Sequence, residues 1–169
     1  MIRNARLVLI GSLMLLIVPN GIETVEIRQY LVEMYRTVRE LFVDKSYYYP
    51  SAILDGVDPR LLEIAEEIIT ELRKQGFDAI IHNGMRSKAQ AAANAASGVG
   101  ILKSKHIVGE AVDIIDKRYA WDTKYLAEIK KFRLAYGALT KNYPEVTWGG
   151  TWTKGKYGAM GDWAHLEIN

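Results

Sequence analysis

The sequence contains no cysteine and only three histidines among its 169 residues. The absence of cysteine excludes disulfide scaffolds, cysteine-ligated zinc fingers, iron–sulfur clusters and thiol nucleophiles. Any site that uses imidazole is limited to His82, His106 and His165. The chain is otherwise ordinary for a globular protein, at 49% hydrophobic and 25% charged residues, so we expect one folded domain with a short appendage.

The body of the chain also lacks an excess of either charge. The formal net charge is +2, from 22 basic and 20 acidic residues. Arg3 and Arg6 lie in the first 21 residues, which contain no acid, so the remainder carries 20 residues of each sign. Nucleic-acid-binding proteins normally show a basic excess, and we therefore expect no nucleic-acid partner.

The N-terminal hydrophobic run is short. Sixteen uncharged residues extend from Leu7 to Ile22, whereas a membrane-spanning helix needs about 20, and the sequence Pro-Asn-Gly at residues 19–21 interrupts the run. Two arginines followed by a mostly apolar segment are typical of a secretory signal. Residues 1–21 are therefore predicted to be a signal or membrane-tethering leader, and a buried helix or strand of the domain is the alternative.

Hydrophobic spacing divides the rest of the chain. A helix over residues 22–43 belongs to a predicted helical spacer (22–54), and turn residues near 45–55 place the start of a domain that extends over 55–169. Within it we expect helices after Asp58-Pro59, after Ser87 in a capping box with Gln90, and after Asp122. Strands are expected at 77–81, 111–115, 146–148 and 163–168. This order favours an α+β fold with a small antiparallel sheet flanked by helices.

Two of the histidines have acidic neighbours that suggest metal chemistry. His106 lies in a predicted loop seven residues before Asp113, and His165 follows Asp162 by three residues near the end of the chain. Two imidazoles and one carboxylate leave an open position on a catalytic zinc ion, and a further carboxylate can accept a proton from the attacking water. Taken alone, His106 is better explained as a surface loop histidine, and Asp113 as a strand-end or cap residue.

Longer motifs strengthen this interpretation. The string SKHIVGEAVD at 104–113 matches the Ser-x-His-x-x-Gly-x-Ala-x-Asp pattern of the VanY-like zinc D,D-peptidase family. NGMRSKAQ at 83–90, WGGTW at 148–152 and DWAH at 162–165 resemble three further segments of that family, in the same order. The resemblance extends from about Asp58 to the C-terminus and is strongest to the phage L-alanyl-D-glutamate endopeptidases.

The resemblance implies a hedgehog/D,D-peptidase-like fold with a zinc site on the sheet. One Zn²⁺ per chain would be held by His106, Asp113 and His165, with Asp162 as the general base. Arg86 would face the substrate, its alternative being a surface arginine at a helix start. The substrate contacts expected in addition are Gln90, Ser104 and Trp148. Ser104 is equally explained as a loop cap, and the tryptophans at 148, 152 and 163 as packing against glycines.

The function implied is a zinc-dependent peptidoglycan peptidase that hydrolyses the L-Ala–D-Glu bond of stem peptides, with a zinc-bound water as nucleophile. Aspartate at position 162, where carboxypeptidases and dipeptidases of the family usually have glutamate, favours the endopeptidase branch. A D-Ala–D-Ala carboxypeptidase, a non-catalytic zinc-containing wall-binding module and an envelope-anchored structural protein are the alternatives. The expected partners are stem peptides and, through the leader, a membrane. The expected location is the cell envelope, with a cytoplasmic phage lysis protein as the alternative.

The sequence also predicts structural roles for three residues that are not expected to bind the metal. Gly109 is expected to turn the chain between His106 and Asp113 with a positive φ. Glu167 shares a strand face with His165, so it either orients that imidazole or is an exposed acid. His82 lies outside every motif and is predicted to be a structural histidine with its hydrogen bonds satisfied.

Overall fold

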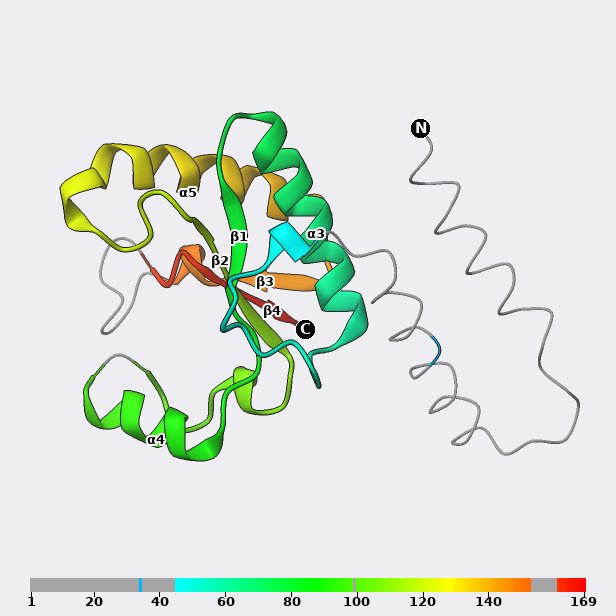
Figure 1. The fold of residues 1–169 in the computed structure, drawn as a ribbon, viewed down its shortest axis with the longest axis vertical. Coiled ribbons are helices and arrows are strands. Elements are labelled where there is room, and N and C mark those ends of the chain that lie inside the picture. The colour runs from blue at the N-terminus through cyan, green and yellow to red at the C-terminus, as the bar shows by residue number, and fades with distance from the viewer. Residues whose placement is uncertain (1–33, 35–44, 99, 153–160) are drawn as a thin grey trace, which may run out of the picture. The chain divides into compact units, whose positions relative to one another are not determined.

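The computed structural model describes Met34 and residues 45–98, 100–152 and 161–169 (Figure 1). Apart from Met34, these residues belong to one compact unit, Lys45–Asn169. The predicted leader (1–21) and nearly all of the predicted helix at 22–43 lie outside the described residues. Within the described ranges, no helix combines the length and the apolar character needed to cross a bilayer.

Helix α3 (Pro59–Lys74) begins and ends as its sequence predicts. The Asp58 carboxylate accepts hydrogen bonds from the backbone N–H groups of Arg60 (2.8 Å) and Leu61 (3.3 Å), which is an N-cap. Past its last turn, Gly76 adopts φ +89°, and the Phe77 N–H donates to Leu72 O at 3.2 Å. This Schellman motif satisfies the last carbonyls of the helix.

Four antiparallel strands form one sheet in the order β1-β2-β4-β3. Their bounds are β1 Ala79–Asn83, β2 Ala111–Asp116, β3 Val146–Trp148 and β4 His165–Ile168. The prediction that β1 starts at residue 77 is wrong by two residues, because Phe77 belongs to the cap of α3 and packs edge-to-face on Phe132 at 5.4 Å. The α+β class, the element order and the small antiparallel sheet are confirmed.

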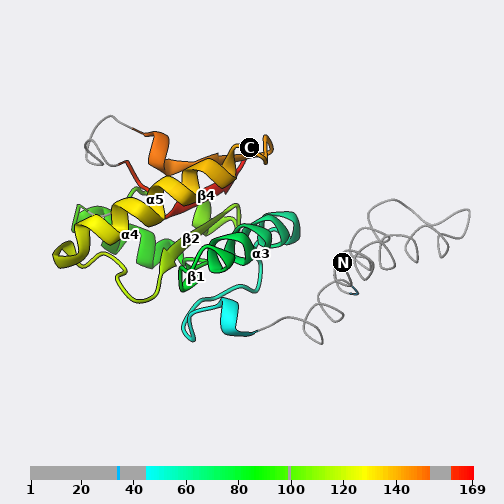
Figure 2. The same ribbon diagram turned by 90° about the horizontal axis from the view of Figure 1, so that it is seen from above.

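Two further helices complete the fold, α4 (Lys88–Ala96) and α5 (Leu126–Thr140). Ser87 caps α4 by accepting from the Gln90 N–H at 3.1 Å, but the Gln90 side chain bonds Asn94 instead of closing the capping box. Asp122 caps a short 3-10 turn that leads into α5. Helices α3 and α5 lie side by side against the sheet, whereas α4 lies on the other side of the strands (Figures 1 and 2).

The core lies between this helix pair and the sheet. Strand β2 is buried along its whole length, and α3 contributes an apolar stripe at helical spacing. The stripe consists of Leu61, Leu62, Ile64, Ala65, Ile68, Ile69 and Leu72. Phe132 and Tyr136 of α5 are also fully buried. The apolar side chains of β2 therefore pack into this core, and the position of the strand is set by packing.

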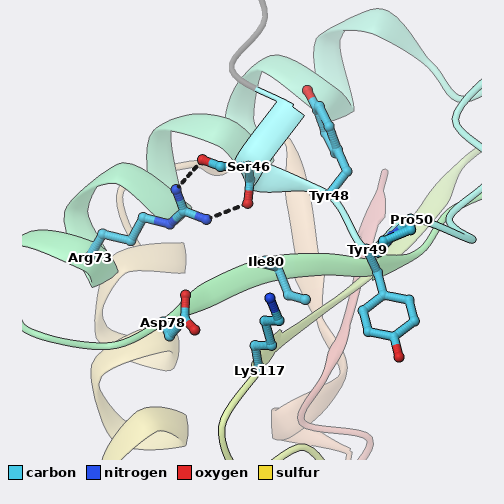
Figure 3. Close-up of a pocket in the computed structure, with 8 residues that line it drawn as sticks. All are labelled: Ser46, Tyr48, Tyr49, Pro50, Arg73, Asp78, Ile80 and Lys117. Atoms are coloured by element: carbon cyan, nitrogen blue, oxygen red, sulfur yellow. Dashed lines mark hydrogen bonds between the residues drawn. The ribbon is translucent and has the colours of Figure 1, made fainter.

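The unit begins about ten residues before the predicted boundary at residue 55. Tyr47 is only 6% exposed and belongs to the core, and the Tyr49 N–H donates to Ile81 O at 2.8 Å. Figure 3 shows Arg73 of α3 reaching Ser46, where it donates to the hydroxyl (2.9 Å) and the carbonyl (2.6 Å). Residues 45–54 are therefore part of the folded unit and not of a spacer.

Candidate metal centre and active site

The register of the sheet brings two predicted metal ligands together. Asp113 on β2 pairs with His165 on β4, and on its other side it pairs with Asn83 on β1. Side chains directly opposite one another on neighbouring antiparallel strands have Cβ atoms about 4.5–5.5 Å apart. Asp113 thus lies at the centre of a polar row that crosses three strands of the sheet.

The third predicted ligand comes from the loop before β2. His106 lies in a short 3-10 helix (Lys105–Ile107) and is only 2% exposed. Gly109 then turns the chain with φ +77°, and a Cβ there would come within 2.0 Å of Gly56 O. The prediction of a positive φ at Gly109 is confirmed, and the close approach adds a second reason for glycine.

The ligand atoms of these three residues lie within 4.8 Å of one another. Asp113 Oδ1 is 3.3 Å from His106 Nε2 and 3.5 Å from His165 Nδ1. These separations are those of atoms that surround a common point, and all three residues are buried. The sequence prediction that His106, Asp113 and His165 come together is therefore matched by the geometry.

The opposite atom of each ligand has its own hydrogen-bond partner. His106 Nδ1–H donates to Gly84 O at 2.7 Å, and His165 Nε2–H donates to Glu167 Oε2 at 3.0 Å. Asn83 donates to the other oxygen of Asp113 at 2.8 Å. Such partners fix the tautomer and orientation of metal ligands. The donor set, two imidazole nitrogens and one carboxylate oxygen turned toward each other, fits a divalent transition-metal ion.

The pKa values of Asp113 and His165 each depend on the charge of the other residue. Burial alone would raise the pKa of Asp113, but hydrogen bonds from His106 and His165 hold that pKa well below its usual range. Burial lowers the pKa of His165, but its bonds to Asp113 and Glu167 outweigh this effect and raise the pKa to about 9. In the absence of a metal, therefore, protonated His165 supplies part of the positive charge that stabilises the buried carboxylate of Asp113.

Asp162 lies beside this cluster on the loop that precedes β4. Its backbone N–H donates to Gly149 O at 2.9 Å, and its carbonyl accepts from the His165 N–H at 3.0 Å. Burial and the negative charge of Asp113 raise the pKa of its carboxyl group. A carboxylate with a raised pKa next to a metal-binding cluster is suited to accept and release protons.

These residues line a cavity of about 420 Å³. Arg86 lies at its wall with its guanidinium 3.6 Å from Asp113 Oδ2 and only 17% of its side chain exposed, so the surface-arginine alternative does not describe it. Buried Ser104 also lines the cavity, without a side-chain cap to its 3-10 helix. A second cavity of about 350 Å³, drawn in Figure 3, contains none of the predicted site residues.

Two predicted substrate contacts do not line the active-site cavity. Gln90 is exposed on α4 and bonds Asn94. Trp148 packs on Tyr136 (5.6 Å between ring centroids) and donates its indole N–H to Trp163 O at 2.8 Å. Among the remaining tryptophans of the motifs, Trp163 is buried in the core, whereas Trp152 lines the cavity and packs 5.2 Å from the His165 ring.

The residues of the cavity wall that were not singled out from the sequence include Asn83, Lys105 and Trp121. Asn83 is a polar residue at the end of an apolar strand, a pattern that could have indicated it. Lys105 approaches Glu167 Oε1 at 3.7 Å and Glu110 Oε2 at 3.8 Å. Nothing in the sequence around Trp121 indicates its position, which depends on the turn at Ala120.

The fold and the site together define an α+β protein with a buried His–Asp–His cluster on its sheet. Residues 48–166 match the family model of the phage L-alanyl-D-glutamate peptidases. The chain therefore belongs to this family, as the sequence motifs predicted.

Two individual proteins illustrate the similarity. The L-alanyl-D-glutamate peptidase of Listeria phage A118 is 27% identical over 130 residues, which cover 73% of this chain and 43% of that protein. The chain thus spans less than half the length of that relative. The crystal structure of the Serratia marcescens L-Ala D-Glu endopeptidase ChiX is 24% identical, with a TM-score of 0.45 over 69% of this chain and 83% of that one.

Proposed function

We propose that this chain is a zinc-dependent peptidase that hydrolyses the L-Ala–D-Glu bond of peptidoglycan stem peptides. The observation that carries the proposal is the buried cluster of His106, Asp113 and His165, which shares its cavity with Asp162. Membership of the L-alanyl-D-glutamate peptidase family supports the choice of bond. The substrate class and the metal are parts of the proposal.

His106 Nε2, Asp113 Oδ1 and His165 Nδ1 would hold the ion, because their opposite atoms are already committed to Gly84, Asn83 and Glu167. Two neutral imidazoles and one carboxylate leave a net charge of about +1 and an open coordination position. When bound, zinc supplies a Lewis acid that polarises the scissile carbonyl and activates a water molecule for attack.

Asp162 moves the proton. Its carboxylate accepts the proton of the attacking water as the carbon–oxygen bond forms, and then delivers it to the amine of D-Glu as the carbon–nitrogen bond breaks. Its raised pKa favours this second step, because the protonated acid remains a competent donor nearer to neutral pH. The Gly149 hydrogen bond to its backbone holds the residue at the cavity wall.

Arg86 binds the substrate. Its guanidinium lies in the cavity next to Asp113 and is held at the backbone by the hydrogen bond from Arg86 N–H to His106 O at 3.0 Å. A planar guanidinium suits a carboxylate of D-Glu or the oxyanion that develops at the scissile carbonyl. In both roles it acts on the substrate and not on the metal.

Digestion of defined muropeptides tests the proposal. The zinc-loaded chain is expected to release a free amino terminus on D-Glu, identified by product mass. Release of the terminal D-Ala would instead assign a D-Ala–D-Ala carboxypeptidase. Stoichiometric zinc with no cleavage of either bond would assign a non-catalytic wall-binding module.

We propose further that residues 1–21 direct the chain to a membrane or to export and take no part in catalysis. Their two arginines and apolar run support this role, and the family match begins only at residue 48. A chain that lacks residues 1–21 should keep its zinc content and muropeptide cleavage and lose membrane association. A truncated chain that fails to fold would show that the segment packs within the protein.

A further inference from the structure

Trp121 is a large aromatic side chain left half-exposed at the wall of the active-site cavity. It is 46% exposed, and it lines the same cavity as His106, Asp113 and Asp162. An exposed aromatic ring at the wall of a concave site with charged groups is a frequent anchor for a bound molecule. The motifs of the family resemblance do not include this residue.

The turn that presents Trp121 is strained. Ala120 has φ +44°, and it is the one non-glycine residue with a positive φ in the described part of the chain. The turn is held by hydrogen bonds from the Ala120 N–H to Asp116 O and from the Asp122 N–H to Tyr119 O, both 2.9 Å. Alanine does not relax into this region of backbone space unless its surroundings require it. Strain of this kind gathers at sites where the position of a side chain matters.

The ring is also packed in place from behind. His82 packs edge-to-face with Trp121 at 4.8 Å, and Tyr49 covers His82 at 4.7 Å. The buried Nδ1 of His82 has no hydrogen-bond partner among the described residues, so His82 acts here as an aromatic spacer. The expectation that the hydrogen bonds of His82 are satisfied is therefore wrong for Nδ1, because its ring is held by aromatic packing instead. An indole supported in this way loses little further freedom when a ligand covers it.

The charged residues of the cavity indicate which part of the substrate the Trp121 ring would bind. The cavity carries cations at Arg86, Lys103 and Lys105, which suit the carboxylates on the D-Glu side of the scissile bond. The face of an aromatic ring is negative and disfavours carboxylates. The other side of the bond carries L-alanine and the neutral muramyl sugar, whose C–H groups suit an aromatic face.

On this basis we propose that Trp121 is the binding platform for the muramyl sugar that precedes the scissile L-Ala–D-Glu bond. The proposal rests on the proposed function, because it assigns the direction in which a peptidoglycan fragment lies in the cavity. Arg86 and Lys103 bind the acidic side, and Trp121 binds the sugar side. The enzyme would accordingly prefer glycan-linked stem peptides to free peptides.

The test compares two probes on the zinc-loaded full chain: N-acetylmuramyl-L-Ala-D-Glu stem peptide, and the same peptide with an acetyl group in place of the sugar. Trp121→Ala should lower kcat/KM at least about tenfold for the muramyl probe and less than about twofold for the acetyl probe, with zinc content unchanged. Trp121→Phe should restore most of the preference. Leu134→Ala, which removes an exposed apolar side chain outside the cavity, should change neither value.

Equal losses for both probes, or no loss for either, would overturn the sugar assignment. The proposed function is tested separately, since a wild-type chain that cleaves neither probe contradicts it. In that case the binding of the two probes to the zinc-loaded Asp162→Ala chain, measured by calorimetry, still decides the role of Trp121. Tighter binding of the muramyl probe that disappears in Trp121→Ala/Asp162→Ala supports the platform, and equal binding of both probes contradicts it.

Discussion

The active-site cavity has two kinds of wall. The sheet wall consists of Asn83, Asp113, His165 and Glu167, which neighbouring strands place by register. The loop wall consists of Arg86, Ser104, Trp121 and Asp162, which turns and loops place one at a time. The sheet wall holds two of the three residues that would bind the metal, Asp113 and His165, and the 3-10 helix before β2 supplies the third, His106. The loop wall holds the groups that would meet the substrate. A site divided in this way can change its substrate without losing its metal.

Removal of a ligand should have the largest effect. His106→Ala or His165→Ala leaves two protein ligands, so zinc binding at stoichiometric concentration and muropeptide cleavage should both be abolished. Metal analysis after dialysis, together with an activity assay, checks this. Full zinc retention in both variants would remove the metal function from the cluster.

A change in the loop wall should separate activity from metal. Asp162→Ala should retain about one zinc per chain and lower kcat by about 100-fold or more, since it removes the proton acceptor. The same metal analysis and a steady-state assay measure both quantities. Loss of zinc in this variant would make Asp162 a ligand and erase the distinction between the walls.

A substitution of Glu167 tests whether the hydrogen-bond partners of the metal ligands contribute to zinc affinity. Glu167→Ala removes the acceptor of the His165 Nε2–H and should weaken zinc affinity about 10–100-fold, measured by competition with a chelator. Glu110→Ala is the matched control, because Glu110 lies near Lys105 at 3.8 Å as Glu167 does at 3.7 Å. If the two variants weaken zinc binding equally, the effect comes from the charge near Lys105 and not from His165.

Proton release on metal binding should give the smallest effect. The pKa of His165 is raised to about 9 in the metal-free protein, so this imidazole is protonated at pH 7 and must lose its proton to bind zinc. Calorimetry at pH 7 in buffers of different ionisation enthalpy should therefore show at least about one proton released per zinc. Zinc uptake without proton release would mean that His165 is already neutral.

The two walls differ in how far the sequence predicts them. Fixed motif spacing identified His106, Asp113 and His165, and hydrophobic periodicity placed the strands that carry two of them. The sequence did not indicate that Asn83 faces Asp113, because a cross-strand pair depends on register and not on spacing along the chain. Trp121 was missed because a strained turn at Ala120 directs it. Gln90 and Trp148 matched motif positions, but local hydrogen bonding and packing place them outside the cavity.

The start of the folded unit, at Lys45 and not at residue 55, also depends on contacts that the local sequence does not reveal. The tyrosines at 47–49 and Pro50 form a polar, turn-like stretch that suggested a linker, yet Tyr47 is buried against α3 and its hydroxyl lies 3.1 Å from that of Thr70. Long-range packing of this kind leaves no local periodicity. The helix caps at Asp58 and Ser87 were predicted correctly, because their partners lie within three residues. Asp122 instead caps the 3-10 turn that precedes α5.

The most direct test of the account is the position of the metal in crystals of the zinc-loaded protein. Anomalous scattering at the zinc edge should show one ion bound by His106 Nε2, Asp113 Oδ1 and His165 Nδ1 at about 2.0–2.2 Å. The Asp162 carboxylate should lie near the ion without binding it. An ion that binds elsewhere, or one that takes Asp162 in place of any of these three ligands, would contradict the account.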